Sequence, residues 1–392
     1  MFETRLSALL YLQGFDEPPV VSPERRIREA YVGLHVGLFD LFLGQRFVRW
    51  GMVDIMSPLN NVNHSDTTVL SMDDPHEGTL PDLMLQIQFF PSDLWYVDAV
   101  YVPFLQPDII DIEETIVQDQ LQIDIGGTSH IYDVDAAFLN RPVEPFSEWA
   151  HSLHVSAHLK SFWVDLTGVY SFYIDQSPDF DLSDIAESEE DTGIDETTHT
   201  ITGIACPAYN RAHSIGLAAA FYLADFLISA DAALKITEDL DGTRIDVKTS
   251  EIVSVLQVER LFWQNRLRAQ AMVLHRYLLH DDAIPVSDYS PVIQAYISAI
   301  VAEYLRQKPE SQLYALIGGD AKFLRERLSV SANIIYGLDE EALFVMPRLS
   351  LKLTDYVSLQ LGSDLWFGQE GRGLLGGSLN NDNIFLRAQL EI

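Results

Sequence analysis

The sequence predicts an all-β fold, a transmembrane antiparallel β-barrel of about sixteen strands. Three observations support this prediction. Runs in which polar and apolar residues alternate recur from the start of the chain to its end, as in strands with one apolar and one polar face. Very short turns follow some of these runs, and long polar loops follow others. No uninterrupted apolar segment approaches the roughly 20 residues of a membrane helix, although 47% of the residues are hydrophobic.

The first long hairpin covers residues 28–50. Its first strand places Val32, Leu34, Val36 and Leu38 on one face and Glu29, Tyr31, Gly33 and His35 on the other. The two strands meet at a tight turn, Gly37 to Asp40, and the second strand ends at Trp50-Gly51. An alternating run at 2–13 precedes this hairpin and is separated from it by loop-forming residues.

Alternating runs resume beyond residue 82 and continue to the C-terminus. In chain order they cover 83–90, 94–104, 152–159, 164–172, 211–222, 225–237, 248–261, 265–276, 312–318, 324–335, 343–353, 356–366 and 383–392. Segment 290–307 breaks the pattern, because Ser290 and Pro291 suit the N-cap and first position of a helix, and we expect a short loop helix there. Even strand numbers are the rule in bacterial single-chain barrels, which favours sixteen. Fourteen and eighteen stay open, because 120–132 could form an extra strand pair or a plug element.

The whole chain, residues 1–392, then forms one barrel domain. Its long segments at 51–82, 105–149 and 174–210 become loops that enter the lumen or extend outside the cell, while the short turns face the periplasm. Residues 175–196 contain ten acids and no Lys or Arg, without the spacing of an EF-hand, so we expect a solvated loop. The expected constriction of the pore comes from polar residues of the first long loop, namely Asp54, Asn60, Asn61, Asn63 and Asp66.

Residues 44–51, Gly-Gln-Arg-Phe-Val-Arg-Trp-Gly, are followed by Asp54 and Pro58 and form a motif of the type G-x-x-x-V-x-W-G-x-x-D. This stretch resembles the early hairpin of a family of Gram-negative outer-membrane porin-like barrels, related to alginate-export barrels. Gln45-Arg46 stands where Arg-Gln is commoner in that family. The last strand resembles the outer-membrane assembly signal, although the usual terminal aromatic residue is absent. The resemblance implies passage of solutes across the outer membrane.

If the apolar faces meet lipid, the polar faces line a lumen. The candidate pore-lining residues are Glu29, His35, Arg46, His154, His158, Asp165, Asp231, Lys235, Arg266, Arg268, Arg327, Arg348, Lys352, Asp364 and Arg387. Together with Asp98 and Glu391 they predict a wall of mixed and slightly basic charge. The net charge of −33 therefore lies largely in the loops, and it argues against nucleic acid as a partner. Mixed charges across a pore select solutes by charge and size, so we expect a channel for passive or selective diffusion of small solutes.

Catalysis is the less favoured expectation. His154 and His158 share a polar face with Ser152 and Ser156, which a hydrolase could use, but no partner carboxylate can be assigned from the sequence. Walker, Rossmann, CxxC and HExxH motifs are absent from the sequence, and Cys206 is the single cysteine. We therefore expect no enzyme activity, no cofactor and no metal.

The expected location is the outer membrane of a Gram-negative bacterium. The sequence starts without a signal peptide, so we expect the export signal to have been removed. The expected partners are outer-membrane lipid and lipopolysaccharide, the barrel-assembly machinery and a small-molecule solute, and the protein is expected to be a monomer or a homotrimer. A barrel plugged by its own loops and an outer-membrane hydrolase are the alternative functions. A soluble β-sandwich or solenoid is the alternative fold.

Overall fold

The computed structural model describes residues 2–8, 27–65, 78–108, 120–125, 128–133, 149–177, 179–181, 186–191, 197–202, 206–244, 247–280, 310–339, 341–354, 357–368 and 383–390. Most of them form one sixteen-stranded antiparallel sheet. In sheet order its strands are β1 (Phe2–Ala8), β2 (Ile27–Val36), β3 (Phe39–Arg46), β4 (Asp82–Phe89), β5 (Trp95–Phe104), β8 (Trp149–Lys160), β9 (Asp165–Ile174), β14 (Arg211–Leu223), β15 (Phe226–Thr237), β16 (Glu251–Phe262), β17 (Leu267–Leu278), β18 (Ser311–Phe323), β19 (Leu328–Gly337), β20 (Ala342–Lys352), β21 (Val357–Phe367) and β22 (Asn383–Leu390).

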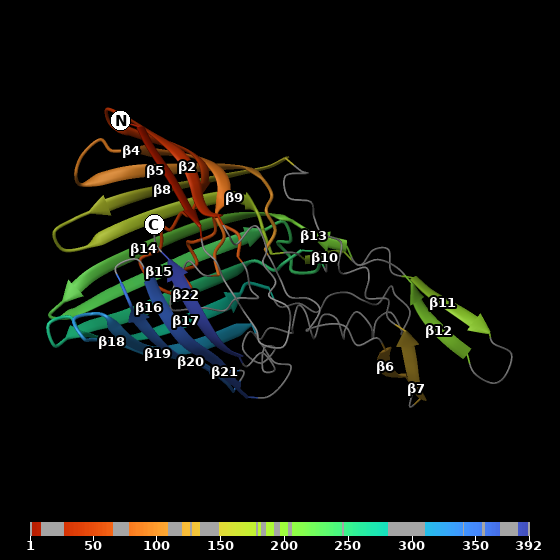
Figure 1. Cartoon of the computed structure of the whole chain (residues 1–392). Coiled ribbons are helices and arrows are strands. Elements are labelled where there is room, and N and C mark those ends of the chain that lie inside the picture. The colour runs from red at the N-terminus through yellow and green to blue at the C-terminus, as the bar shows by residue number, and fades with distance from the viewer. Residues whose placement is uncertain are drawn as a thin grey trace.

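Three small two-stranded sheets lie outside the large one. They are β6 (Gln120–Ile125) with β7 (Thr128–Asp133), β10 (Asp179–Asp181) with β13 (Cys206–Ala208), and β11 (Ala186–Asp191) with β12 (Thr197–Thr202). The segment 120–132, for which the sequence left an extra strand pair or a plug element open, thus belongs to the separate sheet of β6 and β7, outside the large sheet (Figure 1). The predicted all-β fold with about sixteen strands is confirmed. The expected helix at 290–307 lies outside the described residues.

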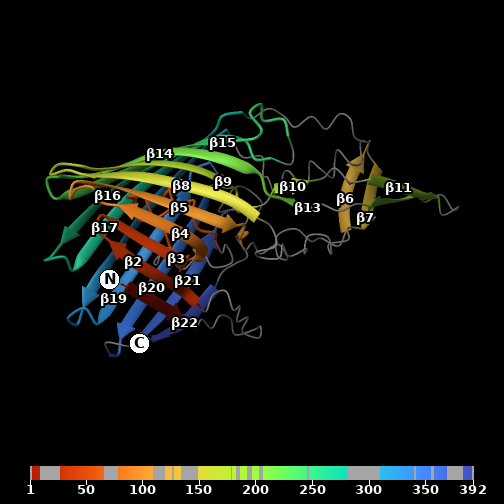
Figure 2. The same cartoon turned by 90° about the horizontal axis from the view of Figure 1, so that it is seen from above.

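The large sheet is strongly curved and surrounds an interior (Figures 1 and 2). Both views place the two chain termini on the same side of the molecule, where the first and last strands form the edges of the sheet. Within the described residues of β1 and β22, no backbone ladder joins these two edges. The part of the chain that the structure describes holds no helix long and apolar enough to cross a membrane.

The two ends of the curved sheet differ in their connections. At one end the strands are joined by turns of two to five residues, at 37–38, 90–94, 161–164, 224–225, 263–266 and 324–327. Gly37 has a φ of +60° in the first of these turns, a conformation that favours glycine. At the other end most connections are longer, and the longest are 47–81, 105–148 and 175–210. We call these the short-turn end and the long-loop end.

The outer face of the large sheet is apolar and exposed. Leu217 on β14 is 70% exposed and Ile317 on β18 is 68% exposed, and both lie in the middle of long strands. Other exposed apolar residues continue the belt round the sheet, namely Val32, Leu43, Leu85, Leu153, Ile215, Leu256, Val273, Ile334, Leu349, Leu361 and Ile384. Soluble monomers rarely expose a contiguous apolar surface of this extent.

The inner face is not uniformly polar. Met272 and Leu274 on β17, with Phe344 and Met346 on β20, form part of a buried apolar cluster that also contains Val53 of the β3–β4 connection. A second cluster gathers Trp50, Leu59 and Val62 from that connection with Met84, Val100, Val169, Ala218 and Ala233 of the sheet. Apolar side chains thus line the interior where the β3–β4 connection packs against it.

Candidate functional site

Residues 47–65 follow β3, fold into the interior and contact the inner face of strands on both sides. We call this segment the inner loop. On one side it reaches β15, where the carboxylate of Asp231 accepts hydrogen bonds from the backbone N–H of Met52 at 3.1 Å, from that of Val53 at 3.3 Å and from the hydroxyl of Ser57 at 2.6 Å. Asp231 is 2% exposed, so water competes little for these bonds. This carboxylate fixes the tip of the inner loop against the sheet.

On the opposite side the inner loop is held by β4 and β5. The indole N–H of Trp50 donates to Asp98 at 3.0 Å. His64 donates its backbone N–H to Asp82 at 2.9 Å, and its ring nitrogen lies 2.9 Å from the other oxygen of the same carboxylate. The loop therefore bridges strands that lie far apart in the sheet.

Asparagines give the inner loop its shape. The amide oxygen of Asn60 accepts from the backbone N–H groups of Trp50 and Gly51 at 3.0 and 3.1 Å. The amide oxygen of Asn63 accepts from the N–H of Val48 at 2.7 Å, and its NH2 group donates to the carbonyl of Arg46 at 2.8 Å. Side-chain amides thus replace a secondary-structure ladder for this backbone.

Two other members of the predicted constriction contact the wall itself. Asn61 accepts a hydrogen bond from Ser171 of β9 at 3.1 Å. Asp54 accepts from Gln257 of β16 at 2.9 Å and from Arg268 of β17 at 3.1 Å. Asp66 lies outside the described residues.

The inner loop packs closely against the sheet because glycine occupies two positions at the contact. Leu59 is fully buried, and its Cδ2 atom lies only 2.1 Å from the position that a Cβ on Gly216 would take. Gly51 is similarly restricted, because a Cβ there would lie 1.9 Å from the hydroxyl of Ser57. These two positions let the loop approach the sheet more closely than any larger residue would allow.

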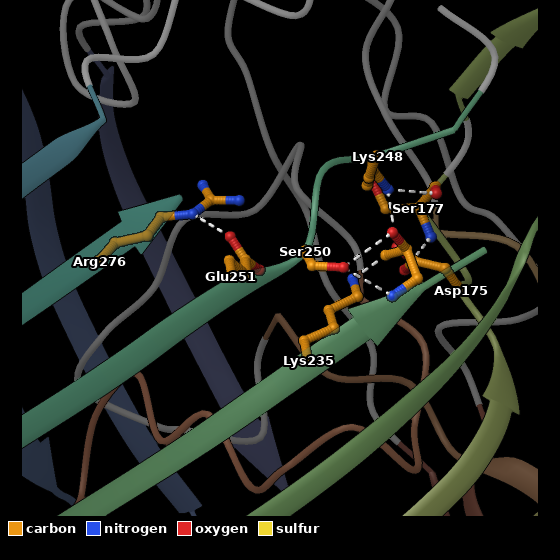
Figure 3. Close-up of polar contacts among 8 residues, drawn as sticks. Asp175, Ser177, Lys235, Lys248, Ser250, Glu251 and Arg276 are labelled. Atoms are coloured by element: carbon orange, nitrogen blue, oxygen red, sulfur yellow. Dashed lines mark hydrogen bonds and ion pairs between the residues drawn. The ribbon is translucent and has the colours of Figure 1, made fainter. Parts of the chain in front are cut away.

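On the long-loop side of the inner loop is a cavity of about 260 Å³, whose charged lining residues are Asp108, Asp175, Lys235 and Glu251. Figure 3 shows the ion pairs at this cavity. Lys235 lies 2.6 Å from Asp175, Lys248 lies 3.0 Å from the same carboxylate, and Arg276 pairs with Glu251. We call it the long-loop cavity.

Two carboxylates at this cavity have shifted pKa values of opposite sign. The two lysines hold the pKa of Asp175 well below its usual range, although burial opposes them. Burial raises the pKa of Asp108 to about 6, in spite of a hydrogen bond from the backbone N–H of Ser65 at 2.6 Å. Asp175 is thus held charged, whereas Asp108 changes its charge near pH 6.

On the short-turn side of the inner loop is a second cavity, of about 340 Å³, which we call the short-turn cavity. Its lining consists of Asp54, Ile55, Arg268, Gln270, Gly319, Asp320, Ser329, Ser331, Asn333, Ser350 and Gln360. Nε of Arg268 lies 2.7 Å from Asp320, and its NH1 atom lies 3.1 Å from Asp54 and 3.5 Å from Glu259. Three carboxylates therefore share one guanidinium here.

The other candidate pore-lining residues occupy different positions. On inward-facing positions of β2 and β3, His35 lies 2.8 Å from Asp40, and the guanidinium of Arg46 lies over the rings of Tyr31 and Phe42. Glu29 shares the inward register of β2. Arg348 and Asp364 form a buried ion pair between β20 and β21.

Several of the predicted pore-lining residues lie at the ends of strands or in the turns between them, and not in the middle of the inner face. Arg266 and Arg327 lie in the exposed short turns 263–266 and 324–327. Asp165 and Lys352 are exposed at the ends of β9 and β20 that join short turns. Arg387 belongs to β22, but its side chain is outside the description.

The two histidines of β8 have different surroundings. His154 is 1% exposed and packs against Trp50 and Tyr173. His158 stacks on Tyr96 with ring centroids 4.2 Å apart, and its ring nitrogens lie 2.7 Å from the hydroxyl of Ser156 and 2.9 Å from that of Thr167. The second partner of His158 is thus a hydroxyl group and not a carboxylate.

Three inward-facing carboxylates were not predicted from the sequence, namely Glu251, Glu259 and Asp320. Alternation could have found the first two, since they share a register with Val255 and Gln257 on β16. Their presence, with Arg266 and Arg327 in turns, contradicts the expectation of a slightly basic wall. Among the described residues, no group of three or more His, Cys, Asp and Glu side chains could hold a metal ion.

No protein-family model and no curated protein sequence matches this chain. Among solved structures, the chain is similar to Acinetobacter baumannii OccAB4, with 8% identity over 92% of this chain and 74% of that one and a TM-score of 0.46. It is also similar to Pseudomonas aeruginosa OccK2 (OpdF) in complex with glucuronate, with 11% identity over 94% and 82% of the two chains and a TM-score of 0.45. A third similar structure is a loop-deletion mutant of OmpT, an outer membrane protein of Vibrio cholerae, with 9% identity over 93% and 79% and a TM-score of 0.37.

Proposed function

We propose that the protein is an outer-membrane channel through which small solutes diffuse, passively or selectively, past a mixed-charge inner loop. One observation carries the proposal: a curved sheet of sixteen antiparallel strands has an exposed apolar outer face, and charged groups and a polar loop lie inside it. A soluble protein would cover that outer face, whereas lipid tails solvate it well. The polar interior then offers a hydrated path.

Aromatic residues at the short-turn end support insertion in a membrane. Phe162 is 90% exposed, Trp163 is 78% exposed and Trp263 is 76% exposed, all in or beside short turns. Aromatic rings are favoured where a membrane meets water. We place this end at the periplasmic side of the outer membrane of a Gram-negative bacterium, with lipid and lipopolysaccharide round the sheet. Insertion there would need the barrel-assembly machinery, and both a monomer and a homotrimer fit the proposal.

The fixed residues of the hairpin motif, on which the proposed relation to porin-like and alginate-export barrels rests, have structural roles. Gly44 has a φ of +142°, and a Cβ there would lie 2.2 Å from the carbonyl of Ala30. Val48 and Trp50 are buried and hydrogen-bonded, and Asp54 reaches Arg268. The motif therefore specifies how the chain leaves β3 and enters the interior.

The firm anchorage of the inner loop favours one alternative, a barrel that is plugged and has a structural or assembly role. Asp231 and Asp98 hold the loop from two sides, and cavities lie on both sides of it. A hydrolase is less well supported, because His158 is partnered by the hydroxyl groups of Ser156 and Thr167. We therefore propose no enzyme activity.

Reconstitution in planar lipid bilayers tests the channel function. The full chain, folded in detergent, should show heat-modifiable migration on a gel and should give discrete conductance steps. A folded protein that inserts without conducting ions would favour the plugged barrel. A protein that stays in solution without detergent would contradict the membrane location itself.

A further inference from the structure

The short-turn cavity combines excess negative charge with neutral hydrogen-bonding groups. Its charged lining residues are Asp54, Arg268 and Asp320, and Glu259 approaches the same guanidinium from β16. Lys322 and Lys352, at the short-turn ends of β18 and β20, are exposed and do not line the cavity. Arg49 is the second guanidinium nearby, because it donates to the backbone carbonyl of Asp54 at 2.7 Å. Two guanidinium groups against three carboxylates leave an excess of negative charge, so the cavity favours a positive charge.

A second, independent observation points to a missing hydrogen-bond donor. Gln270 lines the cavity and is only 5% exposed. Its NH2 group donates to Asn333 at 3.3 Å, but its carbonyl oxygen is buried without a hydrogen-bond partner. Buried acceptors are nearly always satisfied, so this oxygen suits a ligand that brings an N–H or O–H group once the Gln270 side chain turns toward the cavity.

The remaining lining suits a small organic molecule. Ser329, Ser331, Ser350 and Gln360 supply hydroxyl and amide groups, and Ile55 supplies an apolar surface. The volume of about 340 Å³ lies within the range of small-molecule sites. An inorganic ion fits less well, since within the described residues no acidic or histidine cluster could hold a metal.

We propose that the short-turn cavity binds a small organic cation rich in N–H donors, of the kind that carries guanidinium or ammonium groups. The cation meets the carboxylates of Asp54 and Asp320, and the side chain of Gln270 turns so that its carbonyl oxygen accepts a hydrogen bond from the cation. The inference deepens the proposed function, because the bound cation would be a solute of the channel. Since Asp54 belongs to the inner loop, the loop itself forms part of the binding site.

Isothermal titration calorimetry on the full chain in detergent, with agmatine as the probe, tests this proposal. Agmatine should bind, whereas sorbitol, gluconate and Mg²⁺ at equal concentration should bind at least tenfold more weakly. Asp320→Asn should weaken agmatine binding by about tenfold, and Gln270→Leu should weaken it about fivefold, because each removes one acceptor.

Asp225→Asn is the matched control. Asp225 lies in an exposed turn at the same end of the sheet and pairs with Arg260 at 2.9 Å, so its loss changes the same net charge outside the cavity. It should leave agmatine affinity unchanged. The proposal is overturned if agmatine does not bind, if one of the other three solutes binds as tightly, or if Asp225→Asn weakens binding as much as Asp320→Asn.

Measuring both agmatine binding and conductance tests the cation site and the channel function independently. A protein that conducts in bilayers but does not bind agmatine would overturn the cation site and leave the channel intact. A protein that binds agmatine without conducting would support the site and contradict the channel. Folding of each variant is checked by its heat-modifiable migration before titration.

Discussion

The two cavities on either side of the inner loop differ in how their charges are arranged. At the long-loop cavity Asp175 has two lysine partners and Glu251 has Arg276, and with Asp108 the number of carboxylates equals the number of basic groups. In the short-turn cavity three carboxylates converge on Arg268. The difference shows that the inner loop lies between two cavities of unlike electrostatic character.

The largest expected effect comes from removing the carboxylate of Asp231, which holds the inner loop in place between the two cavities. Asp231→Ala leaves two backbone N–H groups and the hydroxyl of Ser57 without their acceptor. We expect docking of the inner loop to weaken by about 3 kcal/mol, since hydrogen bonds to buried charges are the strong ones. The loop should then leave the wall, the two cavities should merge, and single-channel conductance should rise several-fold.

Asp93→Ala is the control for that experiment, because Asp93 is an exposed carboxylate in the turn at 90–94. Its conductance should equal that of the unmodified protein. If Asp231→Ala also leaves conductance unchanged in a folded protein, the inner loop does not limit the pathway.

A smaller effect is expected from overpacking the contact between Leu59 of the inner loop and Gly216 of β14. Gly216→Ala places a methyl group 2.1 Å from Cδ2 of Leu59, and overpacking of this kind typically costs about 1 to 3 kcal/mol. We expect faster hydrogen exchange in residues 57–62 and more frequent conductance flicker. Gly168→Ala is the matched control on the next strand, because the nearest atom to its added Cβ would be 3.8 Å away. Equal hydrogen-exchange rates in both variants would contradict the close contact between Leu59 and Gly216.

The smallest expected effect is a change of hydrogen-exchange rate with pH, which differs in sign for Asp108 and Asp175 of the long-loop cavity. Because the pKa of Asp108 is raised to about 6, its contribution to stability is fully present below about pH 4 and is lost as the pH rises through 6. Hydrogen exchange of the segment that ends at Ser65, corrected for intrinsic rates, should therefore quicken modestly between pH 4.5 and 7. Asp108→Asn should remove this change, and a persistent change would assign it to another group.

The pKa of Asp175 is lowered by Lys235 and Lys248, so the sign of its effect is opposite. Its contribution is present above about pH 4 and is lost as the pH falls below that value. Exchange in residues 171–177 should therefore quicken only in strong acid. Lys248→Gln should move that transition to higher pH, whereas an unchanged transition would show that Lys235 alone holds the carboxylate.

The sequence predicted the strands well because their pattern is local. Ile215 and Leu217 alternate with Ser214, Gly216 and Ala218, and a period of two assigns the two apolar residues to one face without knowledge of any partner strand. The pattern fails on β17, where Ala271 and Val273 face outward and Met272 and Leu274 face inward. When both faces are apolar, alternation carries no information, so the apolar clusters of the interior were not predicted.

By itself the sequence determined the all-β fold with about sixteen strands, the position of the first long loop and the polar residues that it would present. Its asparagines and Asp54 could be named because polar residues cluster there after the alternation stops. Only the tertiary structure decided what they contact. Asp231 holds Met52 across 179 positions of sequence, and Asp54 meets Arg268 across 214. Such pairs depend on how sixteen strands curve round the loop, which no local pattern of residues encodes.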